Sequence, residues 1–427
     1  MWMMAVCLIA AAVTAVAGAA SVPSCSGSGN QSALIFAYWT AVEWRGLHLA
    51  ASCDGLTYTA LNGGRPILNA TCGTMRDVYV HRGPDGKTFH LVSTGSCCPA
   101  GFNYWNTTDF RRFEHAERCW MESAWPNTTA VWAPEWIWVE ARSSYLIFWS
   151  SETDGRPAEG PTGDNLRIYG TWSTDFQTPL AAPSVIFDPG YTVIDANIVQ
   201  VPQGTHGDSG DSTQSVQFNL FFKDERGHNL AGGAHTAALA TASAAGGDAC
   251  SSGAANASLR TVCPGWQPSW DSNHGASCRA QGCCFQPSPD PDPRHYPWCF
   301  ANTSAPPRPQ DKVVRRARSS GRADGGYDME SISAPISPEF SEGPEVVRAP
   351  GTQNSWILYY DCFEAPHYGL ATSDDGMESW TVQQDCAAGA AWKGYPPGIS
   401  FPPGVRHGSF FEVTSAELAA LAAAYPS

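Results

Sequence analysis

Apolar and aromatic residues form short runs along most of this chain, and Gly, Pro, Asp and Ser separate the runs. From Ala33 to about Asn229, and again from Glu339 to Thr414, the runs have the length and alternation of β-strands, with no convincing helical period. Only Ser415 to Ala424 fits a helix. The pattern predicts an all-β fold with one short helix near its end.

One unit recurs in this pattern: an aromatic strand, a loop, a second strand, and then a hydroxylated residue or Cys before Asp. Its copies are LIFAYW with AASCDGLTY, FHLVST with WNTTDFRRF, YLIFWS with GTWSTDFQT, and WILYYD with LATSDDGMESW, while FNLFFKDE opens a fifth. Repeats of this length suit four-stranded propeller blades with long loops. A β-sandwich whose hairpins share turn chemistry is the alternative.

The composition changes between Leu230 and about Ser331, where Ala, Gly, Ser and Pro dominate. We interpret residues 231–330 as an insertion between a first propeller part, residues 30–230, and a last part, residues 331–420. The basic cluster from Lys312 to Arg322 is expected to be a solvated loop, and a proprotein-type cleavage site is its alternative.

The first 20 residues form a short apolar run that ends in small residues, which indicates a secretory signal peptide at residues 1–20. Its removal takes Cys7 away and leaves an even number of cysteines, as expected for disulfides in an oxidising compartment. Asn-x-Ser/Thr sequons lie at Asn30, Asn69, Asn106, Asn127, Asn256 and Asn302. We therefore expect a secreted protein without a transmembrane segment.

The net charge of −15 would repel nucleic acid over most of the surface. The chain has 17 Trp and 14 Tyr but only 15% charged residues, a balance that favours β-sheets and sugar-stacking sites. We expect a monomer that binds carbohydrate.

Six cysteines lie close together in the insertion, in a segment too short to fold around an ordinary hydrophobic core. Zinc is the weaker alternative to disulfides, because adjacent cysteines lack CxxC spacing. The segments RTVCPGW, GASCRAQGCCFQ and YPWCF resemble a P-type (trefoil) domain, here at residues 250–300. The resemblance implies three disulfides, Cys250–Cys284, Cys263–Cys283 and Cys278–Cys299, and a sugar cleft with Trp298, for which packing is the alternative role.

Three acids stand at similar places, just before or within the first strand of a unit: Asp77, Asp195 and Glu342. Glycoside hydrolysis with inversion needs a protonated carboxyl and an ionised carboxylate on opposite faces of the sugar. The inner strands of different blades can bring such residues together at the propeller axis. A single acid at the start of a strand is more often a turn or cap residue, so the interpretation depends on the three together.

The segments LNGGRPIL, RDVYV, VWAPEWIW, VIDANIV, FFKDER, EGPEVV and RHGSFF resemble family-43 glycoside hydrolases, the five-bladed arabinanase, arabinofuranosidase and β-xylosidase group. The resemblance covers Leu34 to about Leu418 apart from the insertion. It implies that Asp77 is the general base and Glu342 the general acid. Asp195 would orient Glu342 and raise its pKa by like charge.

The resemblance also implies substrate contacts from four further residues, Glu135, Trp132, Arg406 and His407. Blade packing is the alternative for Trp132, and a structural role is the alternative for His407. No cofactor is expected, although a calcium ion near His407 is an option. Glu345 is expected on the face of its strand opposite Glu342, towards solvent or a neighbouring blade.

The chain departs from the family where Val78 follows Arg76-Asp77 in place of the usual proline. The expected function is a secreted inverting glycosidase that releases arabinofuranosyl or β-xylosyl residues from cell-wall polysaccharide or glycoprotein. The alternative is a catalytically inactive secreted carbohydrate-binding protein that uses both the propeller and the trefoil domain. A retaining fructan-cleaving propeller ranks last, because no WMNDPNG-like segment occurs near the N-terminus.

Overall fold

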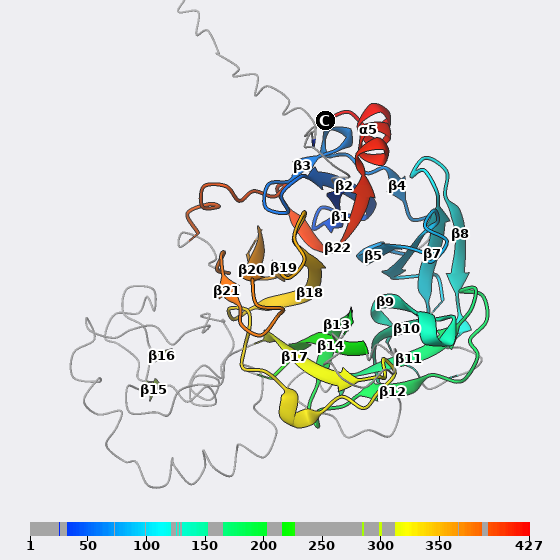
Figure 1. The fold of residues 1–427 in the computed structure, drawn as a ribbon, viewed down its shortest axis with the longest axis vertical. Helices are drawn as coiled ribbons and strands as arrows, with labels where there is room; N and C mark the ends of the chain where they lie inside the picture. Colours follow the sequence, from blue (N-terminus) through cyan, green and yellow to red (C-terminus); the bar gives the residue numbers. More distant parts are fainter. Residues whose placement is uncertain are drawn as a thin grey trace, which may run out of the picture.

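The computed structural model describes residues 25, 32–71, 73–98, 100–120, 125, 128, 130–152, 165–202, 216–226, 284–285, 299–300, 312–365, 367–386 and 392–427. Within these residues the sheets surround a central axis and form a five-bladed β-propeller (Figure 1). The predicted all-β propeller is therefore confirmed. No helix among the described residues is long and apolar enough to span a membrane.

Blade 1 contains strands from both ends of the described chain. From the axis outward it contains β22 (Val405–Thr414), β1 (Ser32–Thr40), β2 (Glu43–Ser52) and β3 (Thr59–Ala60), and β4 (Leu68–Asn69) also pairs with β2. β22 and β1 pair antiparallel from Ser32↔Thr414 to Thr40↔Val405. Such pairing closes the ring of blades through backbone hydrogen bonds.

The other blades follow the chain, each from its inner to its outer strand. Blade 2 contains β5 (Arg76–Arg82), β6 (Phe89–Thr94), β7 (Phe102–Thr107) and β8 (Glu114–Arg118), and blade 3 contains β9 (Trp132–Val139), β10 (Ser144–Ser151), β11 (Arg167–Ser173) and β12 (Ser184–Phe187). Blade 4 contains β13 (Val193–Pro202), β14 (Val216–Asp224) and β17 (Val313–Ser320). Blade 5 contains β18 (Ser341–Arg348), β19 (Trp356–Cys362), β20 (His367–Ser373) and β21 (Thr381–Val382). Short 3-10 helices lie at Asn62–Gly64, Glu140–Arg142 and Met329–Ser331.

β17 corrects two expectations about the basic cluster. It pairs with β14 from Gln217↔Ser320 to Asp224↔Val313, so the propeller resumes by Val313 rather than at residue 331. The arginines that made this segment appear to be a solvated loop are accommodated by the blade: Arg315 binds the buried Asp224 at 2.7 Å, and Arg318 binds Glu378 at 2.7 Å. The insertion is therefore shorter at its C-terminal side than expected.

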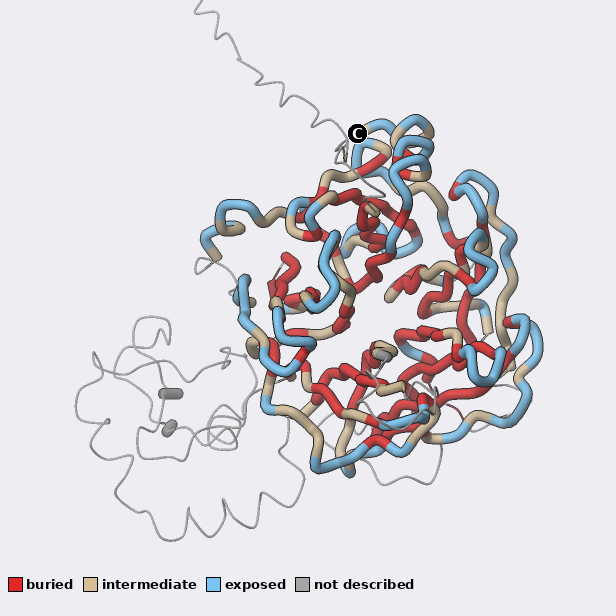
Figure 2. The backbone as a smooth tube through the Cα atoms, in the orientation of Figure 1, coloured by how far each residue is buried: buried red, intermediate tan, exposed pale blue. Residues whose placement is uncertain are grey.

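Each pair of neighbouring blades encloses its own hydrophobic core, because both faces of a blade are buried. On β1, Ala33, Ile35 and Ala37 pack with blade 2, whereas Leu34, Phe36 and Tyr38 pack with blade 5. Three further clusters fill the contacts between blades 2 and 3, 3 and 4, and 4 and 5. Figure 2 shows buried backbone along the inner strands and exposed backbone mainly at the periphery. Burial on two faces explains the nearly continuous apolar runs.

The recurring turn of the sequence follows the third strand in blades 1, 2, 3 and 5. In each copy an Asp carboxylate accepts two backbone N–H groups that lie two to four residues further along the chain. Asp54 accepts from Leu56 and Thr57 at 2.8 Å, and Asp375 accepts from Glu378 and Ser379. These bonds hold the pKa of Asp109 and Asp175 below the ordinary value, and for Asp375 the hydroxyl of Ser379 lowers the pKa most, followed by the backbone N–H of Ser379. The turn is thus a structural device that these four blades share.

The single predicted helix is α5 (Ser415–Ala424), which begins after β22 with a capping box between Thr414 and Glu417. Disulfides join Cys25 to Cys53, Cys98 to Cys119 and Cys362 to Cys386. The last of these links β19 to the segment after β21, as predicted for a local staple of the last blade.

Only two pairs of residues are described in the predicted trefoil segment. They form β15 (Cys284–Phe285) and β16 (Cys299–Phe300), which pair antiparallel. The three predicted trefoil disulfides, Trp298 and the signal peptide at residues 1–20 lie outside the described residues and stay predictions.

Candidate active site

All five inner strands bulge at the same point near their start. The pairing with the second strand shifts between Arg76 and Tyr79, Trp132 and Glu135, Ile194 and Asn197, Glu342 and Glu345, and Arg406 and Ser409. The second residues of these bulges are equivalent and form a ring: Asp77, Ala133, Asp195, Gly343 and His407. Four of them have left-handed backbone, with φ of 51° at Asp77, 45° at Ala133, 52° at Asp195 and 56° at Gly343.

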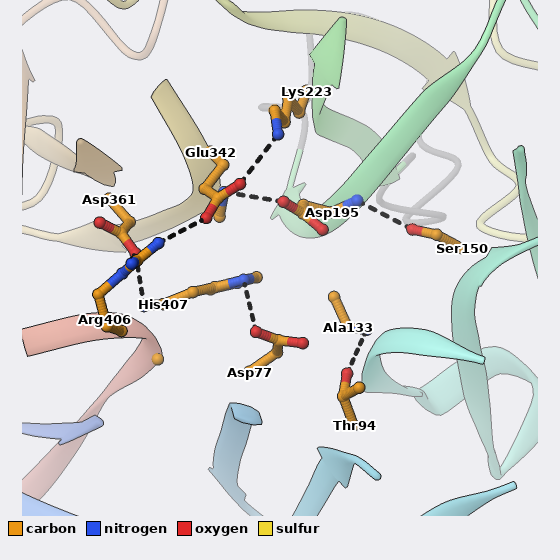
Figure 3. A network of polar contacts seen from close by, with 12 residues as sticks. Asp77, Thr94, Ala133, Ser150, Asp195, Lys223, Glu342, Asp361, Arg406 and His407 are labelled. Carbon is orange, nitrogen blue, oxygen red and sulfur yellow. Dashed lines mark hydrogen bonds and ion pairs between the residues drawn. The ribbon is translucent and has the colours of Figure 1, made fainter. Parts of the chain in front are cut away.

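This ring refines the predicted set of acids. Asp77 and Asp195 occupy equivalent positions, but Gly343 takes that position in blade 5, and Glu342 lies one residue earlier. The expectation that the three acids are equivalent is therefore wrong for Glu342. The bulge nevertheless brings all three to one end of the channel, where His407 Nδ1 lies 3.5 Å from Asp77 and Gly343 N donates to Asp195 Oδ2 at 3.2 Å (Figure 3).

A second ring of side chains, on the second strands, satisfies the backbone of the bulges. Thr94 Oγ1 accepts from Ala133 N at 2.7 Å, and Ser150 Oγ accepts from Asp195 N at 2.9 Å (Figure 3). Likewise Asp361 Oδ2 accepts from His407 N at 3.0 Å. Each residue thus positions the ring residue of the following blade.

Blades 1 and 4 depart from this pattern. The equivalent residues are Trp39, opposite Arg406, and Lys223, opposite Ile194, and neither an indole N–H nor an ammonium group can accept a hydrogen bond. The amide of Gly343 instead uses Asp195 Oδ2 as its acceptor. Lys223 Nζ lies 2.9 Å from Glu342 Oε2, so the exception in blade 4 places a cation directly on the predicted acid.

Glu342 lies between two cations. Besides Lys223, Arg406 Nη2 contacts Glu342 Oε1 at 3.1 Å. Burial raises the pKa of Glu342, but Lys223, then His407 and Arg406, outweigh burial, and the pKa lies below its ordinary value. Glu342 is therefore an ionised carboxylate near neutral pH, and the expected protonation of Glu342 by the like charge of Asp195 is not found in the free protein.

Asp195 shows the opposite behaviour. Burial raises its pKa to about 6, with help from the charges of Glu342 and Asp77 and against the opposing effects of His407 and Lys223. Asp195 and Glu342 therefore depart from their ordinary pKa values in opposite directions.

Arg406 is held in place from behind. Its Nε donates to Asp361 Oδ2 at 2.6 Å, and its guanidinium carbon lies 5.5 Å from the ring centre of Trp39. Asp361 is fully buried, and burial raises its pKa to about 7 despite the attraction of Arg406. One guanidinium therefore bridges Asp361 and Glu342 and fixes the latter's orientation.

A deeper layer of the channel contains Glu135 and Glu345. Both are 2% exposed, and Asn197 Nδ2 donates to Glu135 Oε2 at 3.1 Å and to Glu345 Oε2 at 3.3 Å. Burial, and for Glu135 also the nearby Glu345, raises the pKa of both carboxyls well above the ordinary value. Of the two places expected for Glu345, the neighbouring blade is confirmed, because its carboxylate accepts from Asn197 of blade 4. The solvent alternative is wrong, because Glu345 is buried.

This deeper layer is the place where the optional calcium ion would lie, although the ring nitrogen of His407 there is not an oxygen ligand. Carboxylate oxygens of Glu135 and Glu345 and a ring nitrogen of His407 lie within 4.8 Å of one another. Oxygen ligands suit Ca²⁺, and an ion held there would offset the carboxylate charge beneath Asp77 and Asp195.

Residues 31–244 match a family model described as "Probable glycosyl hydrolase domain", related to glycoside hydrolase family 43. The chain belongs to this family. An α-L-arabinofuranosidase of Bifidobacterium longum subsp. longum is 25% identical over an alignment of 174 residues, with coverage of 35% of this chain and 16% of that enzyme. This family-43-related chain thus matches only a small part of that relative.

Solved structures of low sequence identity are also similar to the chain. A thermostable family-43 glycoside hydrolase is 15% identical with a TM-score of 0.40, over 80% of this chain and 83% of that chain. An α-L-arabinofuranosidase from Lactobacillus brevis is 10% identical with a TM-score of 0.39, over 72% of each chain. A family-43 enzyme from Xanthomonas citri complexed with xylotriose is 12% identical with a TM-score of 0.40, over 74% and 75%.

The aromatic residues near the site divide into two kinds. Trp132, the first residue of β9, is 38% exposed. Trp136 is 2% exposed and packs against aromatic side chains of blades 2 and 3. Trp132 is therefore the more exposed of the two, and Trp136 also lines a cavity of the channel with Tyr79 and Asn197.

Sequence reasoning missed Lys223 and Asp361 as individual site residues of this family-43-related chain. Each is a charged residue at the end of an aromatic strand, in FNLFFKD and WILYYDC. A charge within a run that is buried on both faces needs a partner, and this signal could have identified both.

Proposed function

We propose that the protein is a secreted glycoside hydrolase that releases arabinofuranosyl or β-xylosyl residues with inversion of configuration. The observation that carries the proposal is the convergence of Asp77, Asp195 and Glu342 from three blades at one end of the channel, joined through His407, Gly343 and Lys223. Membership in the glycosyl hydrolase family supports the reaction class. The arabinofuranosidase relative supports the choice of sugar.

In this proposal Asp77 is the base that activates water, and Glu342 is the acid that protonates the leaving oxygen. Asp195 holds the Gly343 amide beside Glu342 and adds negative charge to the site. Arg406 holds Glu342 in position, and Trp132 and Glu135 help to shape the sugar pocket. Because Glu342 is ionised in the free protein, it must take up a proton before each reaction, which predicts an acidic optimum.

Secretion is proposed from the apolar start of the chain, the sequons and the disulfides within the propeller. A monomer is proposed because one chain supplies all the residues named above. The natural substrate is proposed to be a cell-wall polysaccharide or a glycoprotein.

A screen with aryl α-L-arabinofuranosides and aryl β-D-xylosides tests the reaction, and NMR of the first-formed anomer tests inversion. Glu342→Gln and Asp77→Asn should each lower kcat by at least about a hundredfold. Glu330→Gln, at an exposed glutamate, is the matched control and should retain full activity. Unchanged turnover by Glu342→Gln would refute the assignment.

A catalytically inactive carbohydrate-binding protein is the second candidate, favoured by the two cations on Glu342 and by Val78 in place of proline. It predicts that wild-type protein binds arabinoxylan but releases no sugar at any pH from about 4 to 8. Detection of a released pentose by mass would exclude it.

A further inference from the structure

Lys223 is a buried lysine at the centre of a line of alternating charges. Its side chain is 4% exposed, and its Nζ contacts Glu342 at 2.9 Å and Glu225 at 2.7 Å. Lys312 contacts the other oxygen of Glu225 at 3.1 Å. Nζ also lies 4.5 Å from the ring centre of Phe363. A buried lysine held by two carboxylates and an aromatic ring is fixed in place and always charged.

The backbone of the blades does not require a lysine at the position of Lys223. At equivalent positions in blades 2, 3 and 5 the chain uses Thr94, Ser150 and Asp361, which accept the amide of the next inner strand. Lys223 cannot accept a backbone amide, and its ammonium group contacts the carboxylate of Glu342 instead. Blade 1 also lacks an acceptor at this position, where it has Trp39, but only blade 4 places a charge there. Burying a cation costs free energy unless the cation is paired, and Glu342 is one of the two carboxylates that pair with Lys223.

We propose that Lys223 is a positioning residue that holds the Glu342 carboxyl in the site and sets the pH range in which Glu342 can donate a proton. The inference rests on the proposed glycosidase function and adds a control of its acid. Lys223 itself does not donate the proton, because its carboxylate partners hold its pKa above the ordinary value.

The other charges around Glu342 come from four elements, and they determine how far Lys223 acts alone. β22 contributes Arg406 and His407, β13 contributes Asp195, β19 contributes Asp361, and β5 contributes Asp77 through His407. Lys223 has the largest effect among the charges that lower the pKa of Glu342. Removing its charge therefore raises that pKa, and Glu342 stays protonated to higher pH.

The kinetic test compares Lys223→Met with Lys223→Arg on an aryl pentoside. The pH dependence of kcat/KM reports the free enzyme, so the alkaline limb should move up by about 1 to 3 pH units in Lys223→Met. Lys223→Arg keeps the charge and should keep the limb of the wild type within about 0.5 unit. An unchanged limb in Lys223→Met, or an equal shift in both variants, would overturn the proposal.

Glu225→Gln provides a test with the opposite sign and keeps Lys223 in place. It removes a carboxylate that competes with Glu342 for the ammonium group, so the alkaline limb should move to lower pH. This variant decides the matter if Lys223→Met does not fold. A shift to higher pH in Glu225→Gln contradicts the inference.

A direct titration separates this inference from the proposed function. In protein labelled with ¹³C at glutamate side-chain carboxyls, the signal missing from Glu342→Gln identifies Glu342, and its midpoint should rise in Lys223→Met but not in Lys223→Arg. If the wild type hydrolyses no aryl pentoside, the glycosidase proposal fails, and the NMR midpoint still decides the role of Lys223. A titration midpoint of Glu342 that is the same in Lys223→Met and in the wild type refutes the proposed role of Lys223.

Discussion

Arg82 on β5 and Glu417 in α5 form a two-pronged ion pair, with Nη1 and Nη2 each 2.8 Å from a carboxylate oxygen across 335 residues of sequence. The same carboxylate caps the helix by accepting Thr414 N at 2.8 Å. Since α5 directly follows the closing strand β22, this pair fastens the end of the ring to blade 2.

We predict that Glu417→Gln lowers the free energy of unfolding by about 0.5–1 kcal/mol at neutral pH, because Gln retains the cap but loses the ion pair. The pair with Arg82, more than the helix cap, lowers the pKa of Glu417 to about 2. A carboxyl group whose pKa is lower in the folded state stabilises the fold fully at pH values above its pKa in the unfolded chain, which is about 4.3. This stabilisation is lost as the pH falls towards 2. Urea unfolding at pH 7 and pH 3 measures both effects.

The control is Glu378→Gln, whose partner Arg318 lies at 2.7 Å in an ion pair with a 63% exposed glutamate. It should have a smaller effect at pH 7, because exposed pairs are screened by water. Equal losses in both variants would mean that ring closure does not depend on Arg82 and Glu417.

Gly343 is the position in the ring that tolerates no side chain. Its φ of 56° disfavours other residues, and a Cβ there would lie 2.3 Å from Cδ2 of His407. Gly343→Ala should therefore displace His407, lower the free energy of unfolding by about 2–4 kcal/mol and abolish glycosidase activity.

Gly351→Ala is the matched control, because Gly351 has a φ of 74° but nothing within 4 Å of the added Cβ. It carries the backbone strain without the clash and should lose only about 1–2 kcal/mol, with activity unchanged. Thermal melting and aryl pentoside turnover compare the two. If Gly343→Ala is as mild as Gly351→Ala, the close contact with His407 is not limiting.

The blades could be predicted because their signals are local. Each Asp turn is closed by bonds to residues within four positions, and each strand is marked by apolar residues on both of its faces. The sequence signal for helix α5 was equally local, because Thr414 and Glu417 form its cap within one turn. Such features need no knowledge of distant parts of the chain.

The site could be predicted only in part, because the bulge decides it. A strand that alternates regularly would send Glu342 and Glu345 to opposite faces, but the bulge at Gly343 brings both to the channel. The partners of Glu342 are Lys223 and Arg406, 119 and 64 residues away. The sequence around Glu342 reveals neither the bulge nor these distant partners. For this reason the protonation state of Glu342 was predicted wrongly. β17 was missed for the same reason, since its ion partners lie in β14 and near β21.

Glu135 and Glu345 give the last prediction. They share the amide donor of Asn197, whose Oδ1 accepts Val346 N at 3.1 Å. Because burial raises the pKa of both carboxyls, at least one stays protonated at neutral pH. Glu345→Gln mimics the protonated form, and its free energy of unfolding at pH 7 should be within about 1 kcal/mol of the wild type or higher. Asn197→Asp replaces the donor by a charge and should cost about 3–5 kcal/mol.

The pH dependence provides the decisive measurement for this pair. A raised carboxyl pKa stabilises the fold fully below the unfolded value of about 4.3, and the gain is lost as pH rises through the folded pKa, by at most about 1.4 kcal/mol per unit. Chemical unfolding from pH 5 to 8 should show this decline in the wild type and a flatter curve in Glu345→Gln. Glu330→Gln, at an exposed glutamate outside the channel, is the control and should keep the wild-type slope. If Ca²⁺ raises the melting temperature of the wild type but not that of Glu345→Gln, the prediction is contradicted, because a cation rather than a proton then lies between the two carboxyl groups.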